Sequence, residues 1–98
     1  MLYRHGDVLI ERISALPTAT PRPGHTLAHG EVTGHSHRFR DPHSVQLYQH
    51  GATTYLRVLN DTADLIHEEH RTITLPRGDY RFWMQREYSP EAIRRVID

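Results

Sequence analysis

Apolar and polar residues alternate along short stretches of this chain, and turn-forming residues separate one stretch from the next. Alternation with a period of two is typical of strands that bury one face. It predicts strands over residues 7–13, 44–49, 53–59, 63–67, 71–75 and 80–88, with weaker candidates over 26–28 and 31–40. Regular short strands with frequent turns favour an all-β fold, a small antiparallel β-barrel or sandwich.

Proline, glycine and asparagine mark the connections. Residues 16–24 form a proline-rich loop, and residues 50–52 (His-Gly-Ala) indicate a hairpin turn. Asn60-Asp61 and residues 76–79 (Pro-Arg-Gly-Asp) predict two further turns. The tail differs, because Ser89 before Pro90 is a helix start and Ile93, Val96 and Ile97 give one apolar face. The pattern therefore predicts a short C-terminal helix.

The apolar residues that flank residues 67–70 (His-Glu-Glu-His) indicate how two of these strands pair. A two-residue turn would set Leu65 opposite Thr72, with Ile73 on the wrong face. A three-residue loop over residues 68–70 instead pairs Leu65 with Ile73 and Ala63 with Leu75, so apolar residues meet. This register places His67 at a strand end on the core face and His70 in the loop above it.

The length of 98 residues predicts a single domain, residues 1–98, and only 37% of the residues are hydrophobic. A chain of this size buries about two thirds of its unfolded surface, and no cysteine is available for a disulfide. We therefore expect support from a closed barrel, a bound metal or a homo-oligomer interface.

Twelve acidic residues balance twelve basic ones, all arginine, which disfavours a strongly basic nucleic-acid binder. Arginine could reflect GC-rich codons or binding of phosphate and carboxylate groups. The N-terminus lacks an apolar signal region and no apolar run is long enough to span a membrane. We expect a cytoplasmic protein with no membrane partner.

Two clusters hold four of the nine histidines: residues 34–37 (Gly-His-Ser-His) and residues 67–70. In a strand, His35 and His37 point to one face, where they can offer two imidazoles to one ion. His67 and His70 would reach the same barrel mouth. The predicted metal ligands, also candidate catalytic groups, are His35, His37, His67 and His70.

The two glutamates between the second pair of histidines have several possible roles. Glu68 and Glu69 could ligate a metal, orient a histidine, act as a base or form a solvated turn, and Glu69 is a candidate catalytic residue. The string is not the helical His-Glu-x-x-His of zinc proteases. Candidate residues for binding an anionic substrate are Arg38, Arg40 and Arg71.

The other histidines have weaker patterns around them. His29 could approach the site from a loop, and His5 is expected to be structural or exposed. His25, His43 and His50 adjoin glycine or proline and are expected in surface turns.

Two resemblances follow from these motifs. Residues 30–37 (GEVTGHSH), 67–70 (HEEH), 75–80 (LPRGDY) and 85–90 (QREYSP) resemble a family of small uncharacterised bacterial and phage proteins. Gly30 and the His35-x-His37 pair, with a later histidine, are also similar to the cupins, which are small β-barrels that bind metal. Cupins have a glutamate shortly after the His-x-His pair, where this chain has Asp41-Pro42.

Three functions fit the sequence. The first is a metal site for zinc, iron, nickel or copper that activates water or oxygen on a small-molecule substrate. The second is a metal-independent ribonuclease, in which paired histidines are general acid and base on an RNA substrate. The third is a non-catalytic oligomeric binding module with histidines at turns or interfaces. We place the metal site first.

Overall fold

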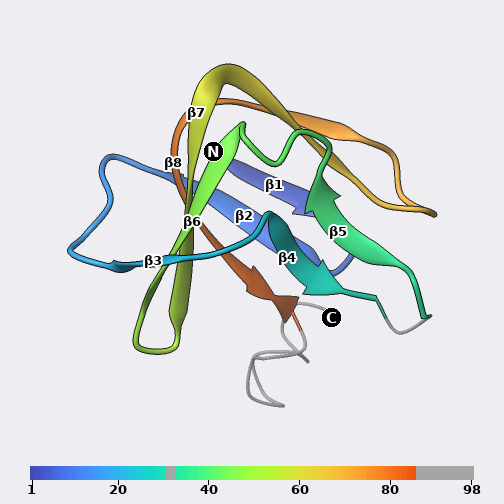
Figure 1. Cartoon of the computed structure of the whole chain (residues 1–98), viewed down its shortest axis with the longest axis horizontal. Helices are drawn as coiled ribbons and strands as arrows, with labels where there is room; N and C mark the ends of the chain where they lie inside the picture. The colour runs from blue at the N-terminus through green and yellow to red at the C-terminus, as the bar shows by residue number, and fades with distance from the viewer. Residues whose placement is uncertain (31–32, 86–98) are drawn as a thin grey trace.

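The computed structural model describes residues 1–30 and 33–85, and the regular elements within these ranges are β-strands (Figure 1). They are β1 (Leu2–His5), β2 (Val8–Ile13), β3 (Thr20–Arg22), β4 (Thr26–His29), β5 (Ser36–Phe39), β6 (Val45–His50), β7 (Thr53–Ile66) and β8 (Ile73–Met84). Every pairing is antiparallel. The predicted all-β antiparallel class is confirmed.

The two longest strands, β7 and β8, form a hairpin at the centre of the sheet. The sheet runs β1-β2-β8-β7-β5-β4, and β6 also pairs with β7 and carries β3 on its other side. The first half of β7 pairs with β6 and its second half with β5, so the sheet branches along this strand (Figure 1). Over the described residues the sheet does not close into a barrel.

The register argued from the apolar residues of β7 and β8 is confirmed. Leu65 pairs with Ile73 and Ala63 with Leu75. The three-residue loop is wrong, because β7 ends at Ile66 and β8 begins at Ile73. Residues 67–72 therefore form a longer loop, and we call it the histidine loop. Both His67 and His70 lie in this loop, outside the hydrogen-bonded pairs of β7 and β8.

The two turns predicted at Asn60-Asp61 and at residues 76–79 are wrong, because β7 and β8 run through them without a break. The register shifts between Val58 and Thr62, so the extra residues form a bulge. Gly78 lies opposite this bulge with φ 152°, and a Cβ there would lie 2.5 Å from Cζ of Arg12. Glycine at position 78 therefore leaves room on β8 for the guanidinium group of Arg12.

Other predicted elements have mixed outcomes. The hairpin between β6 and β7 is confirmed, with His50 opposite Thr53, and β4 covers the predicted residues 26–28. The strand predicted over 31–40 is shorter, since β5 spans Ser36–Phe39. β8 ends at Met84, and the predicted C-terminal helix lies outside the described residues.

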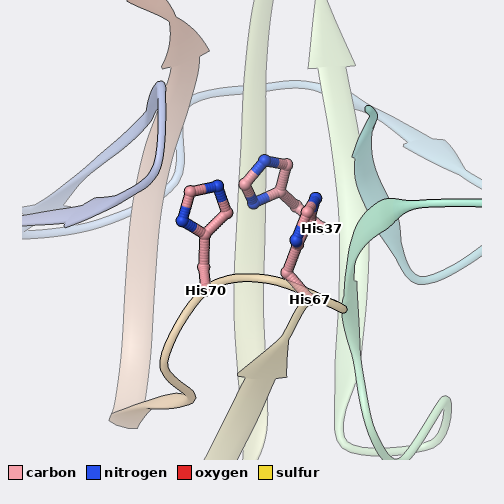
Figure 2. Close-up of side chains that lie close together, drawn as sticks. All are labelled: His37, His67 and His70. Carbon is pink, nitrogen blue, oxygen red and sulfur yellow. The ribbon is translucent and has the colours of Figure 1, made fainter. Parts of the chain in front are cut away.

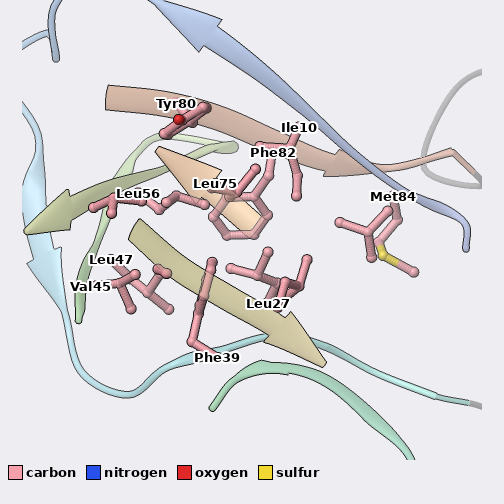
Figure 3. Packing of buried hydrophobic residues seen from close by; sticks show 14 residues of the cluster. Ile10, Leu27, Phe39, Val45, Leu47, Leu56, Leu75, Tyr80, Phe82 and Met84 are labelled. Carbon is pink, nitrogen blue, oxygen red and sulfur yellow. The ribbon is translucent and has the colours of Figure 1, made fainter. Parts of the chain in front are cut away.

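One apolar cluster fills the interior between the strands (Figure 3). Its largest members are almost fully buried: Ile10, Phe39, Leu47, Leu56, Leu65, Leu75 and Tyr80. Phe39 and His37 are two residues apart on β5, and both are buried. The buried face of β5 therefore leads from the apolar core to His37.

Among the described residues, no helix has the length and apolar character needed to cross a lipid bilayer.

Candidate metal centre

Three segments meet at one end of the sheet and bring histidines together. β5 carries His37, and the histidine loop carries His67 and His70. The turn between β1 and β2 closes the third side. Figure 2 shows the three rings turned toward one another, with His67 and His70 entering from the loop. Residues from both predicted clusters thus lie at one place.

The spacing of these three rings suits a single ion. One ring nitrogen from each of His37, His67 and His70 lies within 4.8 Å of the other two. Nitrogens bound to zinc at about 2.0–2.1 Å in tetrahedral geometry would lie about 3.4 Å apart. The three nitrogens would therefore have to approach one another by no more than about 1.4 Å to bind one metal.

Exposure is graded across the three rings. His37 is 2% exposed, His67 is partly exposed and His70 is exposed. The cluster consequently has one side against the core and one side toward solvent, from which water or a small molecule can enter.

His5 belongs to this cluster, although the sequence indicated only a structural or exposed residue. It is 2% exposed at the end of β1. Its Nδ1 lies 2.9 Å from Nδ1 of His37, and its Nε2 lies 2.9 Å from the carbonyl oxygen of Arg71. Gly6-Asp7 joins β1 to β2 as a two-residue hairpin turn, with His5 opposite the buried Val8. That turn signal could have placed His5 on the buried face.

Burial keeps these imidazoles in the neutral form that binds metals. Burial, followed by the neighbouring His5 and His67 rings, lowers the pKa of His37 from 6.5 to about 4. Burial is also the main cause that lowers the pKa of His5, and the hydrogen bond with the carbonyl of Arg71 opposes it. The pKa of His67 is lowered by burial and then by His70. Neutral imidazole is the ligating species.

Gly6 allows the close approach of the rings. It has φ 63°, and a Cβ there would lie 2.7 Å from Nε2 of His70 and 3.0 Å from Cε1 of His37. Only glycine has both the backbone freedom and the space for this position. The β1–β2 turn therefore lies directly against two of the three rings.

Glu68 ties the histidine loop to β5. Its Oε1 accepts the backbone N–H of Ser36 at 3.0 Å, and its Oε2 lies 2.8 Å from Nη1 of Arg38. The Ser36 N–H is the largest of several causes that lower the pKa of Glu68 to about 2, and Arg38 contributes as well. Of the roles open to Glu68 in the sequence, the geometry favours orientation of the loop.

Glu69 and His35 form a second pair beside the cluster. Nδ1 of His35 lies 3.1 Å from Oε1 of Glu69, and the rings of His35 and His67 are 5.6 Å apart. His35, His67 and Glu68 form another group whose ligand atoms lie within 4.8 Å of one another. Glu68 is engaged by Arg38 and Ser36, which makes this group the weaker candidate.

The three arginines predicted to bind substrate have different surroundings. Arg38 is paired with Glu68, and Nη1 of Arg40 lies 3.0 Å from Oδ2 of Asp64. Arg71 lies in the histidine loop and contributes its backbone carbonyl to His5. Substrate binding by these side chains stays a prediction.

The remaining histidines lie elsewhere. His29 is exposed on β4 and not on a loop, and His43 and His50 are exposed. His25 is partly exposed.

Comparison with known proteins gave one family and no individual relative. Neither the curated proteins nor the solved structures yielded a match. The cupin resemblance has no support from these comparisons and stays a prediction. The family model matches residues 4–85, which include every histidine of the cluster. The chain therefore belongs to the family described as "Domain of unknown function (DUF8820)".

Proposed function

We propose that this protein binds one divalent transition metal through His37, His67 and His70 and uses it to activate water for hydrolysis of a small molecule. The observation that carries the proposal is the convergence of three ring nitrogens within 4.8 Å, from two segments far apart in the sequence. Nitrogen ligands suit zinc, copper, nickel and iron, and zinc is the natural first probe.

The ligand number favours a catalytic over a purely structural site. Structural zinc sites are closed by four protein ligands, whereas catalytic sites have three and leave one position to water. The exposed side of the cluster, at His70, gives that position access to solvent.

Asp7 supplies a carboxylate next to the cluster. Its Oδ1 lies 3.6 Å from Nε2 of His37, and its side chain is 44% exposed. A carboxylate at this distance can hold a water molecule and accept its proton. Three neutral imidazoles leave the charge of the ion uncompensated, and Asp7 offsets part of it.

Zinc titration of untagged, chelator-stripped protein by calorimetry tests the proposal. We expect one zinc ion per chain, and binding weakened more than about tenfold in His67→Gln and in His70→Gln, because loss of a ligand exceeds loss of a residue that only orients one. His43→Gln and His50→Gln are matched controls at exposed positions and should bind as wild type. Absence of zinc binding, or equal affinity in all four variants, would contradict the proposal.

One observation favours metal-free acid–base catalysis as a second candidate. The N–H of Glu69 donates to Nδ1 of His67 at 3.0 Å, which leaves the proton of the neutral ring on Nε2. In the metal-free protein, Nε2–H of His67 can thus act as a hydrogen-bond donor. Zinc could bind Nε2 of His67 only after this proton had left that nitrogen. The lowered pKa values of His37 and His67 disfavour an imidazolium acid at neutral pH.

RNA cleavage in excess chelator distinguishes the two candidates. The metal proposal predicts no cleavage that depends on His67 under these conditions. Cleavage that persists with chelator and disappears in His67→Gln would replace the metal proposal by the ribonuclease.

A further inference from the structure

We propose that His5 is a positioning residue that holds the proton of His37 on Nδ1, and thereby leaves the lone pair of Nε2 of His37 free to bind a metal. The hydrogen bonds that support this role are those of the metal-free protein. Only the consequence of this protonation state for metal affinity rests on the proposed function.

The direction of the hydrogen bonds follows from the partner at one end. Nε2 of His5 lies 2.9 Å from the carbonyl oxygen of Arg71. A carbonyl oxygen can only accept, so Nε2 of His5 must carry a proton and donate it. A neutral imidazole carries one ring proton, and Nδ1 of His5 is therefore an acceptor.

The position of the proton on His37 follows from that on His5. The two Nδ1 atoms are 2.9 Å apart, a normal hydrogen-bond distance, and two bare nitrogens would repel each other there. Since Nδ1 of His5 accepts, Nδ1 of His37 donates. Its Nε2 then has a free lone pair.

The opposite arrangement is disfavoured by distance. It would place the proton of His37 on Nε2, directed at Asp7, but that separation of 3.6 Å is too long for a hydrogen bond. It would also leave Nε2 of His5 bare against the carbonyl oxygen of Arg71. A charged His5 would satisfy both neighbours, but at 2% exposure it would bury a cation among other histidines.

His5 also couples the site to the histidine loop. Arg71 follows His70 directly, so the bond from His5 to its carbonyl holds the loop that supplies two of the three proposed ligands. One buried ring thus sets the ligating atom of His37 and anchors the loop. Residues that orient a metal-bound histidine in this way typically contribute about 10- to 100-fold to metal affinity.

Nitrogen-15 NMR of the histidine rings in metal-free protein at neutral pH tests the hydrogen-bond chain without any variant. We expect the two-bond ring correlations to show His37 protonated at Nδ1 and bare at Nε2, and His5 protonated at Nε2 and bare at Nδ1. A proton on Nε2 of His37 would overturn the inference.

Two substitutions of His5 test the consequence. His5→Leu is close in size and removes the acceptor, so we expect His37 to lose its fixed Nδ1 proton and zinc affinity to fall about 10- to 100-fold. His5→Asn keeps an oxygen that can accept from Nδ1 of His37, and should retain that protonation state and most of the affinity. His50→Leu, at an exposed position, is the control.

The outcomes separate this inference from the proposed function. If wild type shows the expected protonation pattern but binds no zinc, the proposed function fails and the role of His5 in orienting His37 stands. If zinc binds but His5→Leu changes neither the ring protonation nor the affinity, the role of His5 is wrong and the metal site stands.

Discussion

At the scale of the residue, the candidate site depends on which polar atoms already have partners. The sequence left several roles open to Glu68 and Glu69 and named Glu69 as a candidate catalytic residue. In the structure Glu68 contacts a backbone N–H and Arg38, while Glu69 contacts His35. The sequence predicted the residue types of the site, because two closely spaced pairs of histidines are conspicuous in a chain of 98 residues. It could not assign partners to the glutamates, since these depend on how the histidine loop folds back on β5.

Replacement of Glu68 tests its role as the tether of the loop. Glu68→Ala removes the acceptor of the Ser36 N–H, so we expect faster hydrogen exchange at that amide and a loss of zinc affinity of no more than about fivefold, as for an exposed ion pair. Glu11→Ala breaks the pair with Arg81 on another part of the sheet and should leave the Ser36 amide unchanged. Unchanged exchange at Ser36 in Glu68→Ala would contradict the tether.

At the scale of the element, alternation predicted the strands that have one buried face, and apolar pairing set the register of β7 and β8. It failed where turn-forming residues occur inside a strand, as at Gly78, because a bulge and a turn use the same residue types. It also passed over β1, a four-residue strand at the end of the sheet that carries His5.

The β1–β2 turn gives a prediction with a closely matched control. Gly6→Ala puts a methyl group 2.7 Å from Nε2 of His70 and adds strain of about 1–2 kcal/mol, because φ is 63°. Gly51→Ala adds the same strain at φ 59°, with nothing within 4 Å of the new Cβ. In urea unfolding and zinc titration, we expect both variants to lose stability but only Gly6→Ala to lose zinc affinity, by more than about tenfold. Equal zinc affinity in the two variants would show that the turn does not shape the site.

At the scale of the whole molecule, histidines from the first strand, from β5 and from the histidine loop meet at one end of an open sheet. The pairing argument predicted that the two clusters meet, but no local pattern predicts that His5 joins them, because the order β1-β2-β8-β7-β5 brings His5 to His70. The sequence therefore indicated four candidate ligands. It could not show which three of them converge, and it did not identify His5 as a further ring beside them.

The buried rings predict that the metal-free protein loses stability in acid. The pKa of His37 is lowered to about 4 in the folded protein and returns to about 6.5 on unfolding, so the unfolded chain binds the extra proton between these values. The contribution of His37 to stability is therefore complete well above pH 6.5 and is lost as the pH falls toward 4, with a loss of about 2.5 kcal/mol at pH 4.5. The lowered pKa of His5 acts in the same direction.

Urea unfolding in chelator at pH 7 and pH 4.5 measures this effect. We expect His37→Gln to lose less stability than wild type between the two pH values, and exposed His50→Gln to behave as wild type. An equal loss in His37→Gln and wild type would contradict a buried neutral His37.

The proposed metal site consists of His37, His67 and His70 around one ion. X-ray absorption spectroscopy of the zinc-loaded, untagged protein tests it most directly, because it reports the kind and number of atoms around the metal. We expect three histidine nitrogens at about 2.0–2.1 Å with one further nitrogen or oxygen ligand, and a loss of imidazole scattering in His67→Gln. A shell made mainly of oxygen, or a spectrum that His67→Gln leaves unchanged, would contradict it.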